Sequence, residues 1–71
     1  MKKISVSLQG HQTSISLENE FADTLRKMAD ADGMSVAAVI DSIDAVRGDG
    51  SNLSSEIRIY ILRRLLKTAK L

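Results

Sequence analysis

Residues 12–18 read QTSISLE, a stretch in which polar and apolar side chains alternate before the spacing changes at Asn19. Alternation with a period of two is typical of a strand that has one buried face. The residues expected on the buried face are Thr13, Ile15 and Leu17. Those expected on the outer face are Gln12, Ser14 and Ser16. The stretch therefore predicts a short strand with a row of uncharged polar groups turned outward.

A near copy of this stretch stands nine residues earlier, where Ser5–Leu8 reads SVSL and the later copy, Ser14–Leu17, reads SISL. Its alternation begins at Ile4 and predicts a second strand. A type II′ turn with Gly10 at its first central position would join the two strands into a hairpin. The pairs expected from that turn are Val6 with Ile15 and Ile4 with Leu17.

After Asn19 the apolar residues recur every three or four positions, which predicts an amphipathic helix. The apolar stripe consists of Phe21, Leu25 and Met28. Gly33 is expected to end this helix in the left-handed conformation, and Ser35 is a suitable N-cap for a second one. A flexible break at Gly48–Ser51 then precedes a third helix. The predicted units, all within one domain of 1–71, are a strand or arm at 1–9, a ribbon strand at 12–17, and helices at 19–31, 35–47 and 52–69.

Length and composition limit the class of protein. A chain of 71 residues buries little apolar surface, so a partner or a second copy is expected to stabilise it. There is no cysteine, and the single histidine, His11, is interpreted as a surface residue at the hairpin turn. No apolar run approaches the ~20 residues of a membrane span, and no signal-peptide core follows Lys2 and Lys3. We therefore expect a cytoplasmic protein with no membrane contact.

The third predicted helix carries more apolar residues than one packing surface requires. Ile59, Leu62 and Leu66 lie outside its main stripe, and they belong either to the intrachain core or to a subunit interface. The same helix carries a row of cations at spacings of four and three, namely Arg63, Lys67 and Lys70. That row is either a solvated face or a stripe that binds a phosphate or a partner.

This order of elements resembles the ribbon-helix-helix family of DNA-binding proteins, and the match covers 12–47. The resemblance rests on QTSISLE, on the Phe21, Leu25 and Met28 spacing, and on Gly33-Met34-Ser35 between the helices. A bacterial subgroup with an added C-terminal helix also resembles this chain at GHQTSISLE and at NLSSEIR (Asn52–Arg58). The resemblance implies a mostly α fold with a short β ribbon, in which two chains intertwine and their paired strands enter the DNA major groove.

The resemblance also implies roles for particular residues. The expected base contacts are Gln12, Ser14 and Ser16, and the expected phosphate contacts at the second helix are Met34 and Ser35. The expected dimer core is Ile15, Leu17, Phe21, Leu25, Met28, Val39, Ile40 and Ile43. Lys2 and Lys3 either contact phosphates as an N-terminal arm or keep an edge strand soluble.

The physical chemistry of these side chains is compatible with DNA reading. The amide of Gln12 can bond N6 and N7 of adenine together, whereas Ser14 and Ser16 can only discriminate weakly. A solvated strand face would show the same residue types, and Ser35 is equally compatible with an ordinary helix cap. The first strand raises a geometric difficulty, because two hairpins meeting across a dimer form a four-stranded sheet that is too wide for a groove of ~12 Å. The strand at Ile4–Leu8 is therefore expected either to cap an edge of the ribbon or to pair with a strand of another protein.

These observations lead to a hypothesis and an alternative. The hypothesis is a sequence-specific transcription regulator, of the repressor or antitoxin-like kind, whose partners are double-stranded DNA, a second copy of the chain, and a toxin-like protein or higher oligomer. The alternative is a protein-interaction module that uses the third helix and the first strand and binds little DNA. We expect no enzyme, cofactor or metal, because the sequence shows no catalytic triad, carboxylate pair, phosphate loop or metal-ligand spacing.

Overall fold

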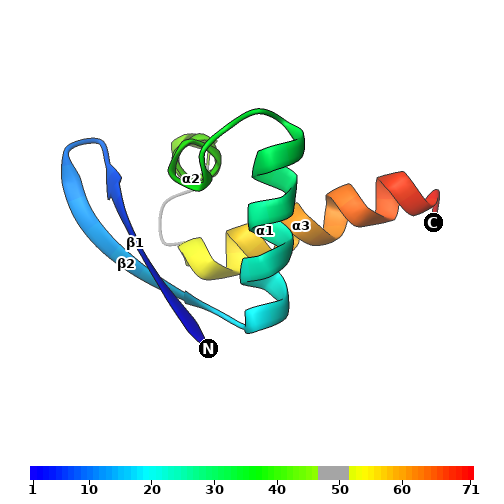
Figure 1. Cartoon of the computed structure of the whole chain (residues 1–71), viewed down its shortest axis with the longest axis horizontal. Helices are drawn as coiled ribbons and strands as arrows, with labels where there is room; N and C mark the ends of the chain where they lie inside the picture. Colours follow the sequence, from blue (N-terminus) through cyan, green and yellow to red (C-terminus); the bar gives the residue numbers. More distant parts are fainter. Residues whose placement is uncertain (47–51) are drawn as a thin grey trace.

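The computed structural model describes residues 1–46 and 52–71, and it consists of a hairpin followed by three helices (Figure 1). The elements in chain order are β1 (Lys2–Leu8), β2 (His11–Leu17), α1 (Asn19–Ala31), α2 (Val36–Val46) and α3 (Leu53–Ala69). The predicted fold class, a short β ribbon followed by three helices, is confirmed. The predicted break at 48–51 and the last residue of the predicted second helix lie outside the described residues.

The hairpin forms, but its turn and register differ from the prediction. The turn residues are Gln9 and Gly10, with φ of 51° and 83°, and positive φ at both positions corresponds to a type I′ turn rather than type II′. Ile4 consequently faces Ile15, and Val6 faces Thr13. The observed pairing is shifted by two residues from the expected one. Because the side-chain period of a strand is also two, the shift leaves each residue on its predicted face.

The first two helices begin and end where local backbone chemistry requires. Gly33, with φ of 67°, follows α1, and its N–H donates to the Asp30 carbonyl while that of Met34 donates to the Ala29 carbonyl. This pair of bonds is the Schellman arrangement of a helix C-terminus. The N–H of Ala38 donates to Ser35 Oγ at 3.1 Å, so Ser35 is the N-cap of α2.

One apolar core joins all five elements. The strands contribute their inward residues and each helix contributes one stripe, so that the core is formed by Val6, Leu8, Ile15, Leu17, Ala22, Leu25, Met28, Ala29, Val39, Ile40, Ile43, Leu53, Ile57 and Ile61. Leu17, Leu25, Ile40 and Ile57 are fully buried within this one chain. In Figure 1 the N-terminal half of α3 lies against the other helices, and its C-terminal half extends beyond α1.

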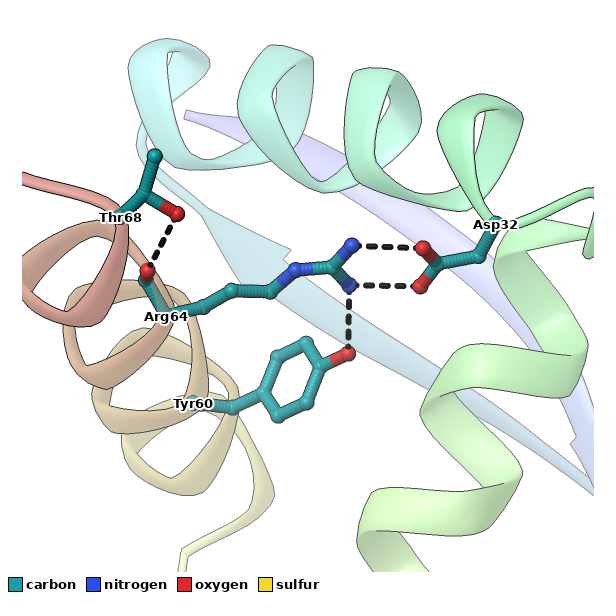
Figure 2. Close-up of polar contacts among 4 residues, drawn as sticks. All are labelled: Asp32, Tyr60, Arg64 and Thr68. Carbon is teal, nitrogen blue, oxygen red and sulfur yellow. Dashed lines mark hydrogen bonds and ion pairs between the residues drawn. The ribbon is translucent and has the colours of Figure 1, made fainter.

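Two ion pairs attach α3 to the rest of the fold. Arg58 donates from Nε and Nη2 to the two carboxylate oxygens of Glu18, at 2.8 and 3.2 Å. Arg64 donates to both oxygens of Asp32 at 2.6 Å and to the hydroxyl of Tyr60 at 3.0 Å (Figure 2). These hydrogen bonds from guanidinium groups lower the pKa of each carboxyl below its ordinary value.

The outer side of α3 remains apolar. Ile59, Leu62, Leu65 and Leu66 are 39, 53, 49 and 37% exposed, and we call these four residues the α3 outer stripe. None of the helices in 1–46 and 52–71 has the length and hydrophobicity that a membrane crossing requires.

Candidate nucleic-acid interface

The outward face of the hairpin is a patch of polar side chains from both strands. The cross-strand pairs on this face are Lys3 with Ser16, Ser5 with Ser14, and Ser7 with Gln12, and all six side chains are exposed. We call these six residues the ribbon face. The alternation in the sequence produces this arrangement, because the residues between them turn inward and join the core.

A hydrogen bond links the two strands at the middle of the ribbon face. The hydroxyls of Ser5 and Ser14 lie 3.3 Å apart, and either one can be the donor. A serine hydroxyl has one hydrogen and two lone pairs, so the bonded pair still offers one hydrogen and several lone pairs outward. The pair can therefore both donate to and accept from an external group.

The three residues predicted as base contacts lie together on β2. Gln12, Ser14 and Ser16 are exposed and point to the same side of the strand. Sequence reasoning did not include their neighbours on β1, Ser5 and Ser7, in this face. The signal for them in the sequence is the repetition of the SVSL pattern, whose alternation places Ser5 and Ser7 on the same side of β1.

The two N-terminal lysines lie in different places. Lys3 belongs to the ribbon face, opposite Ser16. Lys2 shares the side of the strand that faces the helices, and its Nζ lies 3.5 Å from Oδ1 of Asp23 on α1, with both side chains about half exposed. The side chain of Lys3 is thus the one cation of the ribbon face.

The turn between α1 and α2 holds the two residues predicted as phosphate contacts. The Ser35 hydroxyl accepts from the Ala38 N–H, and the Met34 N–H is already bonded to Ala29. Both side chains are exposed. The Ser35 bond is that of an ordinary N-cap of α2, and the Met34 bond belongs to the C-terminal cap of α1.

The residues predicted for the dimer core lie in the core of one chain. Ile15, Leu17, Leu25, Met28, Val39, Ile40 and Ile43 are buried, and Phe21 is half-buried against them. The covering contacts come from β1 and α3 of the same chain, through residues such as Val6 and Ile57. Their burial therefore requires no second chain.

The cations of α3, together with Lys70 directly after it, divide into two groups. Arg58 and Arg64 are held by Glu18 and Asp32, whereas the row of Arg63, Lys67 and Lys70 is exposed. A hollow of about 340 Å³ lies between the end of α2 and this side of α3, with Val46 and Ile59 among its apolar lining and Arg63 and Lys67 among its polar lining. His11 is exposed next to the hairpin turn, and no cluster of potential metal ligands occurs in the described part of the chain.

Comparison with known proteins identifies one similarity. Residues 1–65 match a family model described as a ribbon-helix-helix domain. No curated protein and no solved structure matches the chain. The match includes β1 and most of α3, so it extends beyond the segment at 12–47 on which the sequence resemblance was based.

Proposed function

Because the chain belongs to the ribbon-helix-helix family, we propose that it is a sequence-specific transcription regulator that reads DNA with its ribbon face. Proteins of this family are generally DNA-binding transcription regulators, and they bind DNA as dimers. The regulator is of the repressor or antitoxin-like kind and acts in the cytoplasm.

The ribbon face is the observation that carries this proposal. A two-stranded ribbon is narrow enough for the B-DNA major groove, which is about 12 Å wide. On this ribbon every outward side chain from position 3 to 7 and from 12 to 16 is a serine, a glutamine or a lysine. These groups can form hydrogen bonds with base edges or phosphates, whereas the apolar side of the hairpin is occupied by the core.

Gln12 is the principal base reader in this proposal. Its amide can accept from adenine N6 and donate to N7 at the same time, which discriminates adenine from the other bases. Serine hydroxyls donate or accept indifferently and contribute less discrimination. Lys3 supplies attraction to the phosphate backbone, together with Lys2 and the exposed turn at Met34 and Ser35. The small number of cations predicts a shallow dependence of affinity on salt.

A second copy of the chain completes the regulator by covering the α3 outer stripe. The family binds DNA as dimers, and β1 occupies one edge of β2 in the two-stranded sheet while no strand of the described residues lies along the other. The exposed apolar side chains of α3 provide a further contact surface, because burial of apolar area is the main driving force of association.

Selection of bound duplexes from a random pool tests the proposal. We expect the wild-type protein to enrich an adenine-containing sequence. Gln12→Ala should abolish the preference at particular bases, whereas Lys3→Ala should weaken binding to all sequences alike. Equal losses on every sequence for Gln12→Ala would contradict base reading, and Ser55→Ala, at an exposed serine of α3, is the matched control.

The alternative function is a protein-interaction module on the same scaffold. It is favoured by the α3 outer stripe and by the hollow beside it, where apolar residues adjoin Arg63 and Lys67. A different protein would then occupy this face in place of a second copy. Failure to retain any genomic fragment at low salt, together with a monomer in sedimentation, would favour this alternative over DNA binding.

A further inference from the structure

We infer that the α3 helices of two copies of the chain pack against each other in antiparallel orientation, and that charged residues beside the outer stripe set this orientation. The inference rests on the part of the proposed function that places a second copy on the outer stripe, and it adds how that copy is arranged. It also gives a task to the exposed cations at the end of α3, which lie outside the ribbon face.

The exposed apolar residues of α3 are spaced as in a contact between two helices. Ile59, Leu62 and Leu66 follow one another at intervals of three and four, and this spacing keeps one apolar seam facing a neighbouring helix. In an antiparallel pair centred near Leu62, Ile59 of one chain lies across from Leu66 of the other. The seam therefore fits a second copy of itself.

A row of charged side chains borders this seam. Glu56 precedes Ile59 by three residues and lies in the first turn of α3, and Arg63 follows Ile59 by four. Residues separated by three or four positions are neighbours on a helix surface. Lys67 and Lys70 continue the row to the end of α3 and the position directly after it. In the described part of the chain, the side chains of Glu56, Arg63, Lys67 and Lys70 form no ion pair.

The order of charges along the row favours the antiparallel orientation. In an antiparallel pair, Glu56 of each chain lies toward the end of the other helix, where Lys67 and Lys70 stand, so attraction occurs at both ends of the contact. In a parallel pair Glu56 would face a second Glu56, and Lys70 a second Lys70, and like charges repel. Arg63 lies near the middle of the antiparallel pair and faces its own copy, which is unfavourable.

The outer stripe is too small to hold two chains together by itself. Its four side chains are 37 to 53% exposed, so they offer less than the roughly 800 Å² per partner that a stable interface buries. The contact must therefore belong to a larger dimer interface. Arg58, one turn before Leu62, donates to both carboxylate oxygens of Glu18, the residue directly after β2. The stripe thus adjoins the end of the strand that, as the resemblance implies, pairs with a second copy.

An acidic segment of a different protein is the competing occupant, because the row carries more cations than acids. Arg63→Gln separates the two possibilities. The substitution removes the repulsion between two Arg63 side chains, so self-association should strengthen by about two- to fivefold. If a different protein occupies the stripe, Arg63→Gln should leave self-association unchanged.

The main test measures self-association of the purified chain by sedimentation, without DNA. Glu56→Lys should raise the dissociation constant about three- to thirtyfold, because attraction becomes repulsion at both ends of the pair. Adding Lys67→Glu and Lys70→Glu to this variant should restore most of the affinity. Glu20→Lys makes the same change at an exposed position in the first turn of α1 and should have no effect.

The restored variant separates pairing from a change in the helix itself. Glu56 also lies near the N-terminus of α3, where a negative charge is favourable to the helix dipole, and the added substitutions do not restore that charge. Circular dichroism should show the same fold for all variants. The loss in Glu56→Lys should also shrink as salt is added, because exposed charges are screened.

Three results would overturn the inference. They are unchanged self-association in Glu56→Lys, a restored variant as weak as Glu56→Lys alone, and no strengthening in Arg63→Gln. If the wild-type chain still enriches particular sequences from the random pool, any of these results removes the antiparallel pairing and leaves DNA reading in place. A wild-type chain that stays monomeric at every concentration overturns both the pairing and the proposed dimer.

Discussion

At the scale of single residues, the turn of the hairpin determines which side chains face each other. Gln9 and Gly10 both adopt positive φ, a conformation that glycine tolerates and that most other residues avoid. A methyl group at Gly10 would meet no atom within 4 Å, so only the backbone conformation disfavours a larger residue there. Glutamine at position 9 is itself an unusual choice, since asparagine is the typical residue for this part of a type I′ turn.

Gly10→Ala should therefore destabilise the protein by about 1 kcal/mol, because a left-handed residue with a Cβ costs roughly that much. Gln9→Asn should have the opposite effect, and the free energy of unfolding in urea would measure both. An alanine variant as stable as the wild type would contradict the turn geometry described here.

Asp32 is a second residue whose position has a measurable consequence. The hydrogen bonds from Arg64 lower its pKa, so its stabilising contribution is present above the ordinary carboxyl pKa of about 4 and is lost as the pH falls through the lower value of the folded state. We expect Asp32→Asn to melt below the wild type at pH 7 and the difference to shrink below pH 4. Asp30→Asn, at an exposed carboxylate of the same helix, is the control. A melting difference that did not depend on pH would contradict the ion pair.

At the scale of elements, α3 allows one chain to bury its own core. Leu53, Ile57 and Ile61 form the buried stripe of α3, and the pairs of Arg58 with Glu18 and of Arg64 with Asp32 hold the helix in place. The expectation that a second copy stabilises a chain of this size stays a prediction. The second copy is proposed to cover the outer stripe.

Ile57→Ala tests the structural role of α3. The Ile57 side chain is fully buried, and its truncation leaves a cavity, so we expect a loss of about 3 kcal/mol in the free energy of unfolding. Lys67→Ala, at an exposed position of the same helix, should cost far less. Equal effects of the two substitutions would show that α3 does not pack as described.

The elements also show what the sequence can and cannot predict. Periodicity predicted the strands, the helices and the inward residues, because burial imposes a period of two or about 3.6 on the chain. It could not predict the register of the hairpin, since a slip of two residues preserves the pattern. The ion pairs were missed because Arg58 and Glu18 are 40 positions apart, and Arg64 and Asp32 are 32 apart, distances on which local patterns carry no information. The negative charge of Asp32 at the C-terminus of α1 is unfavourable to the helix dipole. Its hydrogen bonds to Arg64 compensate for this cost and explain why an acidic residue stands there.

At the scale of the whole molecule, the two exposed surfaces have different proposed tasks. The ribbon face is polar, whereas the outer stripe is apolar. The first lies on the hairpin and the second on α3, the two elements at either end of the chain (Figure 1). Separate surfaces for DNA and for a second chain allow association and base reading to be altered independently.

Leu62→Gln should weaken association of the chains without altering the ribbon face. The substitution removes apolar surface from the centre of the outer stripe, so sedimentation should show a shift from dimer to monomer with an unchanged circular dichroism spectrum. The base preference should persist, because the ribbon face is untouched. A dimer that withstands both Leu62→Gln and Leu66→Gln would mean that the chains associate elsewhere.

The most direct test of DNA reading by the ribbon face is a map of amide chemical shifts, recorded by nuclear magnetic resonance, as a selected duplex is added to the labelled protein. The account predicts that the largest shifts fall on residues 3–16, in both strands, with small changes along α3. Large shifts confined to Arg63, Lys67 and Lys70, with the hairpin unaffected, would contradict it.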